Sequence, residues 1–537
     1  MIRFFVLFLL IFISGNALTQ HIYSDTTWER WYGRQYYNEL PSATNQQIEH
    51  YDKGYIFHLQ NDFPSAPLKP ILKKTDINGY FLWERKLDST LNKAINGIKK
   101  YDDGGIIVYG GIYHNNNEFP NPWVAKLNAC MEVEWCKLFQ WNRNSYVKDL
   151  AIDLEGNIVA LTFGYGEYLN ERINLIKLAP DGELIWKGNY ATRDDYPHIW
   201  NAIPQKLLIS QDNHYYIAGK AEWPTNNVPG QGSGVRSLFI KVNPDGEEEW
   251  LLPFGIYDNL FTQCRSLYQI SDTMFAGLCH SYTSHNPVMV YFNENGEVLS
   301  FVDKTIMPEF SYENKLVNPI LLEDNTFWGI WRYLYTSDEV TYHYGYMHFD
   351  TALNIIDYKE DDRWRDPANL KYTFNNKFVT FGSMKENNST NNYDIYLNKR
   401  NFDFSYDTVY SNWSGDYDTL CPEGIVSGYL PYTCDMIVGI DEIPSPEEYK
   451  EAQEKIGIQV QPNPAHTQVT LILENTSKFK NLHISVFNQT GEEVYTRKLR
   501  NCTQEELLNI SNWSSGIYFI VIRNESKMVG STKLVVE

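Results

Sequence analysis

The stretch Lys177–Trp186 reads KLAPDGELIW, and Lys241–Trp250 reads KVNPDGEEEW. Both copies place a basic residue, an acidic turn with a glycine and a tryptophan at the same spacing. The Pro-Asp-Gly-Glu segment predicts a tight hairpin, because Asp and Gly tolerate the backbone conformations that such turns need. We expect the tryptophan to open the next strand and to bury its ring between neighbouring sheets. The stretch therefore predicts a structural repeat rather than a catalytic motif.

This turn-and-tryptophan motif recurs along most of the chain. Its copies end at Trp83, Trp135, Trp186, Trp250, Ser300, Asp357 and Ser405. A second motif, a polar turn followed by a short β-rich run, recurs in phase with the first. Its copies contain Gly54, Gly105, Asn157, His214, Thr273, Thr326 and Lys377. A period of about fifty residues with four short strands per unit is typical of a β-propeller. We predict an all-β fold with seven blades, six or eight being the neighbouring counts.

Two features refine the propeller prediction. The segment TTWERWYGRQYYNEL, which starts at Thr26, has an aromatic strand without a preceding partner of its own. We expect it to pair with the last blade, because this would close the ring and remove open sheet edges. The links and second–third loops are long and irregular, whereas the other turns are short. One face of the propeller should therefore carry the long loops, and such a face commonly binds the partner.

The two ends of the chain predict export. Residues 1–19 combine Arg3, an apolar run and small residues before a cut after Thr19, as in a secretory signal peptide. The apolar run is too short to span a bilayer comfortably, and we expect no transmembrane segment in the mature chain. The propeller should occupy residues 20–438, followed by an acidic, proline-containing linker over residues 439–456. Residues 457–537 alternate apolar and polar positions around a hairpin and predict a small β-sandwich.

The last of these segments carries a family resemblance in four ordered motifs. They are PNP, VFNQTGEEV, SSGIYFIVI and the closing KLVV. Together they resemble the type A C-terminal sorting domain of the type IX secretion system. The matching residues are Pro462, Asn463, Pro464, Gly491, Gly516, Ile517, Tyr518 and Lys533. The resemblance implies contact with the type IX machinery of a Gram-negative bacterium, removal of this domain, and a mature protein that is released or attached to the cell surface.

The seven cysteines suit an oxidising compartment. Six of them form pairs that are close in sequence, and Cys502 is left over. These pairs are Cys130 with Cys136, Cys264 with Cys279, and Cys421 with Cys434. Spacing predicts three local disulfides, although it cannot fix the connectivity. No pair has the C-x-x-C spacing of a redox or zinc site, and we predict no metal site.

Composition and motifs narrow the function without defining it. The net charge of −21 argues against nucleic-acid binding, which needs a positive field. We find no H-E-x-x-H or G-x-S-x-G motif, and we assign no catalytic residue and no cofactor. The sequence favours a binding scaffold that holds a glycan or a protein on the long-loop face. The alternative is a secreted polysaccharide-acting enzyme, similar to a glycoside hydrolase, with its site at the propeller mouth.

Overall fold

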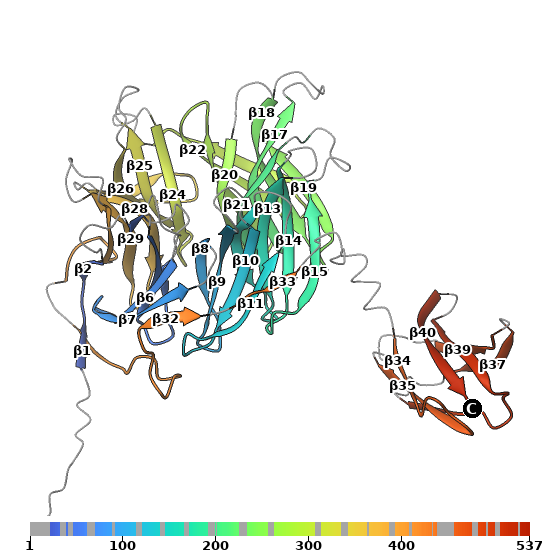
Figure 1. Cartoon of the computed structure of the whole chain (residues 1–537). Helices are drawn as coiled ribbons and strands as arrows, with labels where there is room; N and C mark the ends of the chain where they lie inside the picture. Colours follow the sequence, from blue (N-terminus) through green and yellow to red (C-terminus); the bar gives the residue numbers. More distant parts are fainter. Residues whose placement is uncertain are drawn as a thin grey trace, which may run out of the picture. The chain divides into compact units, whose positions relative to one another are not determined.

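A computed structural model gives the arrangement of the chain (Figure 1). The residues that it describes are 22–32, 39–40, 47–61, 70–88, 92–113, 121–139, 145–165, 171–191, 199, 201–224, 233–255, 262–306, 313–334, 342–361, 365–385, 393–407, 411–431, 433–437, 456–474, 482–489, 492–499, 505–524 and 527–537. The predicted signal peptide, the predicted linker except Ile456, and most of the long loops lie outside these ranges, as do Gly491 and Cys502. Among the described residues, no helix could span a membrane.

The described part of residues 22–437 is all β, and its strands follow one another as antiparallel sheets in chain order. The first two sheets contain β3 (Glu39–Leu40), β4 (Gln47–Glu49), β5 (Tyr55–Asn61), β6 (Pro70–Thr75) and β7 (Phe81–Asp88), then β8 (Asn92–Lys100), β9 (Ile106–Tyr113), β10 (Asn121–Leu127) and β11 (Val133–Phe139). The next two contain β12 (Ser145–Ile152), β13 (Ile158–Tyr165), β14 (Glu171–Leu178) and β15 (Leu184–Tyr190), then β16 (Ala202–Ile209), β17 (Tyr215–Pro224), β18 (Ser233–Val242) and β19 (Glu248–Phe254). The all-β prediction is confirmed.

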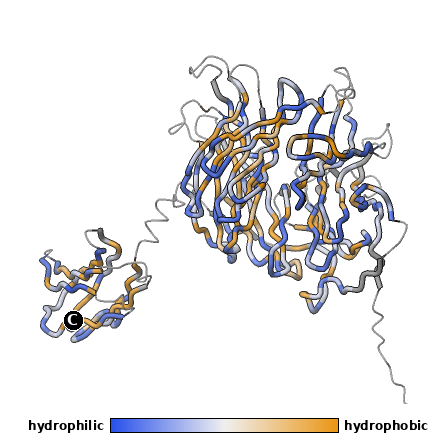
Figure 2. Tube along the Cα trace, turned by 180° about the vertical axis from the view of Figure 1, so that it is seen from behind, coloured by the Kyte–Doolittle hydropathy of each residue, from blue (hydrophilic) through white to orange (hydrophobic). Residues whose placement is uncertain are grey.

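Three further sheets complete the series. They contain β20 (Thr262–Ser271), β21 (Met274–Ser281), β22 (Pro287–Asn293) and β23 (Val298–Asp303); β24 (Glu313–Leu321), β25 (Phe327–Leu334), β26 (His343–Phe349) and β27 (Ile355–Asp361); and β28 (Arg365–Tyr372), β29 (Lys377–Lys385), β30 (Tyr393–Asn401) and β2 (Trp28–Trp31). We count β4 to β7 as the first to fourth strands of the first sheet. The first strand of each sheet then contacts the first strand of the next, and β28 contacts β4 again. The first strands therefore form a closed series. Figure 2 shows apolar residues along many of these strands and polar residues at many turns.

The repeated motif holds one sheet to the next. The indole N–H of Trp135 on β11 donates to the carbonyl of Pro180, 3.0 Å away, in the last turn of the following sheet. Trp250 on β19 donates in the same way to the carbonyl of Glu294, at 2.9 Å. Gly182 follows Pro180 with a φ of 85° and receives the Trp135 ring, so a side chain there would collide with the ring. The motif therefore encodes contacts between neighbouring sheets.

The basic residue of the motif acts within its own sheet. Lys177 on β14 lies 3.0 Å from a carboxylate oxygen of Asp153, in the turn between the first two strands. Lys126 on β10 lies 2.6 Å from Asp103, which is in the corresponding turn of its own sheet but two residues further along that turn. Each ion pair ties the third strand to the first turn of its sheet. The repeat is thus explained by packing and by these local ion pairs.

The N-terminal strand closes the series, as predicted. β2 pairs antiparallel with β30 and supplies the outer strand of the last sheet. The Trp28 indole N–H donates to the Ile77 carbonyl in the first sheet, at 2.9 Å. Trp28 therefore makes the contact that Trp135 and Trp250 make elsewhere. Strand β1 (Ile22–Asp25) pairs with β31 (Ser411–Ser414) beside this junction.

The segment after the last sheet returns to the first two sheets. β32 (Gly428–Pro431) adds a parallel strand to β7, and β33 (Asp435–Ile437) adds one to β11. We call residues 411–437 the returning segment. Disulfides join Cys130 to Cys421 and Cys136 to Cys434, across sequence separations of 291 and 298 residues. The prediction of local disulfides is wrong for these four cysteines.

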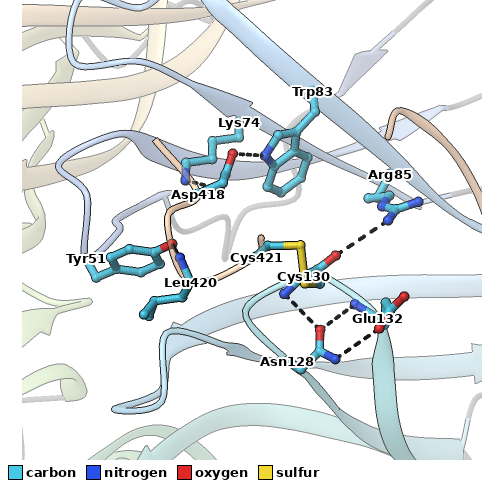
Figure 3. Close-up of a disulfide and its surroundings, with 10 residues drawn as sticks. All are labelled: Tyr51, Lys74, Trp83, Arg85, Asn128, Cys130, Glu132, Asp418, Leu420 and Cys421. Atoms are coloured by element: carbon cyan, nitrogen blue, oxygen red, sulfur yellow. Dashed lines mark hydrogen bonds and ion pairs between the residues drawn. A yellow bond between two sulfur atoms is a disulfide. The ribbon is translucent and has the colours of Figure 1, made fainter. Parts of the chain in front are cut away.

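A buried polar network anchors the returning segment beside the first disulfide (Figure 3). One carboxylate oxygen of Asp418 lies 2.6 Å from the Lys74 ammonium, and the other accepts the Trp83 indole N–H at 2.9 Å. The backbone N–H of Leu420 donates to the Tyr51 hydroxyl at 3.1 Å. The backbone N–H of Asp418 also donates to Asp52, at 2.9 Å. The segment thus completes hydrogen bonds that the first sheet cannot make alone.

The strands after residue 443 belong to a second compact unit. One sheet contains β34 (Gly457–Gln461), β35 (Gln468–Glu474) and β38 (Glu505–Asn509). The other contains β37 (Glu493–Lys498), β36 (Leu482–Phe487), β39 (Gly516–Asn524) and β40 (Lys527–Val536). Buried side chains from both sheets, including Leu471 and Ile520, share one apolar core.

Candidate functional site

The first strands of six sheets share an irregularity, which is a β-bulge against the second strand. The register skips Asn96 on β8, Lys148 on β12, Gln205 on β16, Arg265 on β20 and Ala368 on β28. On β24 it skips Asn318 and Pro319. Bulges re-aim side chains and are common beside functional sites. The recurrence at one level of the closed series makes these residues the candidate site.

Two of the bulged residues link neighbouring first strands. The Asn96 side-chain amide donates to the carbonyl of Val147 at 2.9 Å, and that of Asn318 donates to the carbonyl of Ala368 at 3.1 Å. Each bond runs from one bulge to the bulge region of the next sheet. We call the row of bulges the belt of bulges. The two bonds connect its β8 and β12 members and its β24 and β28 members, and Lys148, Gln205 and Arg265 occupy the equivalent positions on β12, β16 and β20.

The first strands are basic although the whole chain is acidic. Among their described side chains, the basic residues are Lys99, Lys100, Lys148, Lys206, Arg265, Lys315 and Lys371. The acidic residues among the same side chains are Glu49, Asp149 and Glu313. This excess of basic residues contrasts with the net charge of −21 for the chain. A like-charged group of this kind favours anionic partners.

One group of charges surrounds Asp149, and we call Lys99, Asp149 and Lys206 the Asp149 cluster. The Lys206 ammonium lies 2.9 Å from one Asp149 oxygen, and the Lys99 ammonium lies 3.5 Å from the other. The Leu207 backbone N–H also donates to Asp149, at 3.1 Å. Burial of Asp149 opposes its ionisation, but the two lysines outweigh this effect and hold the pKa of Asp149 below its ordinary value.

The Asp149 cluster has more positive than negative charge. The pKa of Lys99 is lowered to about 8, mainly by burial. Repulsion from Lys206 and Lys371 also lowers this pKa, whereas attraction to Asp149 raises it. Burial also lowers the pKa of Lys371, with repulsion from Lys206 and Lys100. Lys99 and Lys206 retain side-chain exposures of 28% and 34%. Part of this charge therefore remains open to solvent.

A second group lies on the two sheets that begin with β20 and β24. We call Arg265, Glu313, Lys315, Arg332 and Tyr342 the Tyr342 cluster. The guanidinium of Arg332 lies 4.3 Å from the centre of the Tyr342 ring, and the Lys315 ammonium lies 5.8 Å from it. Glu313 pairs with Lys315 and accepts the Tyr342 hydroxyl at 2.8 Å. The single carboxylate is thus shared between a lysine and a tyrosine.

Arg265 brings further positive charge to this cluster. Burial lowers the pKa of Lys315 to about 8, and repulsion from Arg332 and Arg265 contributes. Burial also lowers the pKa of Arg265, which Arg332 repels. Nearby, the Tyr282 hydroxyl donates to the side-chain oxygen of Gln263, and the Tyr282 ring is 40% exposed. The Tyr342 cluster is therefore a positive group bordered by polar and aromatic side chains.

Within the part of the chain that the structure describes, two groups of side chains have spacings that could suit a metal ion. His280, His285 and Glu313 offer ligand atoms within 4.8 Å of one another, as do His50, Asp52 and Asp418. The Lys74 ammonium already lies between Asp52 and Asp418, so that group forms an ion pair.

The first group has positive neighbours. Burial lowers the pKa of His280 to about 3, and repulsion from Lys315, Arg265 and Arg332 contributes. Added positive charge is therefore unfavourable here. This environment suits an anion better than a dication.

The predicted tryptophans all lie on the fourth strands of their sheets. Trp83 and Trp186 are buried, whereas Trp135 and Trp250 are half-buried. Cys264 and Cys279 lie opposite each other on β20 and β21, but they are free thiols, so the third local disulfide is absent. Sequence reasoning missed the bulges and the first-strand cations. The first-strand cations could have been found from the sequence, because a basic residue recurs in successive predicted first strands.

The predicted sorting residues come together in the second unit. The Asn463 side chain donates to the carbonyl of Lys533 at 3.0 Å and accepts the Val535 N–H at 2.8 Å. Pro462 and Pro464 flank Asn463, and both follow cis peptide bonds. Gly516, Ile517 and Tyr518 begin β39 and line a pocket with residues of the 488–494 hairpin. All four motifs therefore meet through β39 or its neighbour β40.

The comparisons with known proteins identify the C-terminal region. Residues 459–537 match the secretion system C-terminal sorting domain. This match indicates a secreted protein that the type IX secretion machinery recognises. No curated protein matches the chain.

Solved structures resemble this chain only distantly. A protein of unknown function from Dyadobacter fermentans has 9% identity and a TM-score of 0.38, covering 70% of this chain and 98% of that one. The polysaccharide lyase Uly1 has 8% identity and a TM-score of 0.41, covering 69% and 93%. The α-L-arabinofuranosidase of Fusarium graminearum has 10% identity and a TM-score of 0.38, covering 70% and 98%. Likeness at this level supports no functional conclusion.

Proposed function

We propose that this chain is a secreted seven-bladed β-propeller that binds an extracellular ligand on its first strands. The propeller occupies residues 20–438, the linker residues 439–456, and a β-sandwich sorting domain residues 457–537. The closed series of first strands and the shared core of the two C-terminal sheets support this division. The mature protein is released or held at the cell surface after the signal peptide and the sorting domain are removed.

The recurring bulge supports the binding role more than any other observation. It turns Lys148, Gln205 and Arg265 out of register at equivalent positions. Arg265 and Lys315 lie early in β20 and β24, directly after the long links. These residues therefore belong to the end of the first strands that faces the predicted long-loop side.

A binding role fits these side chains better than glycoside hydrolysis. A glycosidase commonly uses two carboxyl groups about 5 to 10 Å apart across the scissile bond. Among the described first-strand side chains, Asp149 and Glu313 are each held by lysine ion pairs. Because each carboxylate is paired with a lysine, we assign both the role of holding the neighbouring lysine side chains in position. The polysaccharide-acting enzyme remains the rival function, which turnover of a substrate would establish.

The test uses protein purified from the culture medium or cell surface. It is applied to a glycan array and, in parallel, to a panel of chromogenic glycosides. We expect array binding that Arg265→Ala weakens, without turnover. The matched control is Lys359→Ala on the outer strand β27, where the lysine side chain is 46% exposed. Equal binding by both variants would contradict the assigned surface, and turnover would establish the enzyme instead.

The sorting role has its own test. Deletion of residues 457–537 should leave the chain in the periplasm, and Asn463→Ala should reduce its delivery to the surface. Asn463→Ala removes the bonds that join the PNP segment to β40. Fractionation with antibody detection measures the distribution. Normal surface delivery of the truncated chain would overturn the assignment.

A further inference from the structure

We infer that the Tyr342 cluster is a subsite for the acidic groups of a polysaccharide that carries carboxylates or sulfates. This inference rests on the proposed ligand binding by the first strands and names the ligand class. It is supported by three cations on adjacent sheets: Lys315 and Arg332 lie opposite each other on β24 and β25, and Arg265 repels both of them. Arg265 comes from the bulge of β20, Lys315 from β24, and Arg332 from β25.

The charge balance of the cluster favours an anion. Glu313 is the carboxylate that pairs with Lys315, and it is also hydrogen-bonded to Tyr342. His280 lies 3.9 Å from Glu313 and adds no positive charge near neutral pH, because its pKa lies well below that range. Within the Tyr342 cluster as defined, three cations therefore accompany one carboxylate. A ligand anion would relieve their mutual repulsion, and guanidinium groups bind carboxylate or sulfate oxygens through paired hydrogen bonds.

Two side-chain arrangements support binding of a sugar polymer rather than a compact ion. Arg332 is stacked on the Tyr342 ring, which holds its guanidinium plane in place. Tyr282 has an exposed ring, and its hydroxyl is bonded to the Gln263 amide oxygen. An aromatic face with nearby amide and hydroxyl groups suits a hydroxylated ring. Lys99 and Lys206 of the Asp149 cluster provide further positive charge on β8 and β16. An extended polymer could contact both clusters along the belt of bulges.

The first experiment compares polymers that differ only in charge. Mature secreted protein is titrated with polygalacturonate, its carboxyl-reduced form, dextran sulfate and dextran, and binding is measured by calorimetry. We expect binding of the two charged polymers, weakening as salt is added because salt screens the attraction. Binding of the neutral polymers alone would overturn the acidic class while leaving ligand binding on the first strands intact. Binding of poly-glutamate in place of both charged polysaccharides would point to an acidic protein and contradict the inference.

The second experiment uses substitutions with opposite expected signs. Arg265→Gln and Lys315→Met should each weaken polygalacturonate binding about tenfold, because each removes a charge-assisted contact. Glu313→Gln should strengthen it several-fold, because it removes the competing carboxylate. A gain of affinity cannot result from misfolding. Lys359→Met on the outer strand is the matched control and should bind as the unsubstituted chain does. Unchanged affinity in all three cluster variants would overturn the subsite.

Discussion

The Trp135 indole of one sheet lies against Gly182 of the next and donates its N–H to Pro180, 3.0 Å away. This contact explains why the motif needs both a tryptophan and a glycine. The glycine provides a positive φ for the turn and leaves space for the ring of the preceding sheet. The two residues therefore act as a pair across the boundary between sheets.

Gly182→Ala should destabilise the protein through this contact. A Cβ atom at this position would lie 2.7 Å from the Trp135 ring, and φ is 85°. Backbone strain costs roughly 1–2 kcal/mol and overpacking roughly 1–3 kcal/mol. Urea titration of both proteins measures the change in the free energy of unfolding.

Gly156→Ala is the matched control for this substitution. Gly156 has a φ of 83°, and the nearest atom to its Cβ position is the Tyr101 hydroxyl oxygen at 3.4 Å. It therefore carries the backbone strain without the ring contact. Equal losses of stability in the two variants would show that the ring contact contributes nothing.

Trp28 should be essential for closing the series of sheets. It is 5% exposed and bonds to Ile77 in the first sheet, whereas Trp31 on the same strand is 43% exposed. Trp28→Ala should lower the free energy of unfolding by about 3–5 kcal/mol, as for other buried aromatic truncations. Trp31→Ala should cost much less. Deletion of residues 21–40 should lower the melting temperature further, and an unchanged melt would contradict closure by this segment.

The long-range disulfides predict a defined peptide map. Proteolysis without reduction should yield one linked pair containing Cys130 and Cys421 and another containing Cys136 and Cys434. Cys264 and Cys279 should react with an alkylating reagent after unfolding without reductant. Linked peptides between Cys421 and Cys434 would refute the structure of the returning segment.

Loss of one disulfide should destabilise the chain measurably. Because the Cys136–Cys434 bond would remain, the Cys130–Cys421 bond closes only the short loop made of residues 130–136 and 421–434. The chain-entropy treatment gives roughly 3 kcal/mol for a loop of this size. The double substitution of Cys130 and Cys421 by serine should therefore lower the midpoint of chemical unfolding. The same substitutions at Cys264 and Cys279 leave no bond to break and serve as the control. If the Cys130/Cys421 double substitution lowered the unfolding midpoint less than the Cys264/Cys279 double substitution, the stabilising role of the disulfide would be contradicted.

The sequence predicted the features that recur at a fixed spacing. It did not predict the features that depend on how neighbouring strands pair. Turn glycines and tryptophans recur at a fixed spacing, so they could be identified without the structure. The bulge at Arg265 is a relation between β20 and β21, and no spacing along one strand reveals it. Cys421 was paired with Cys434 because they are close in sequence. Their true partners are brought near by closure of the sheets, which sequence distance does not report.

His58 should make the protein less stable in mild acid. It is fully buried on β5, its two ring nitrogens have no hydrogen-bond partner among the described residues, and burial lowers its pKa to about 3. The unfolded chain binds a proton there below about pH 6.5, whereas the folded chain does not. Stability should therefore fall as the pH drops from 6.5 towards 3, by up to about 1.4 kcal/mol per pH unit for this residue.

Substitution separates this contribution from that of the carboxylates. The depressed pKa of Asp149 contributes stability above the ordinary aspartate pKa, so its loss belongs to lower pH. His58→Phe should flatten the stability curve between pH 6.5 and 4.5, because it removes the proton that the unfolded state takes up. His466→Phe is the control, since that imidazole is 71% exposed. Urea unfolding at each pH gives the slopes, and identical slopes in the unsubstituted chain and His58→Phe would disprove the linkage.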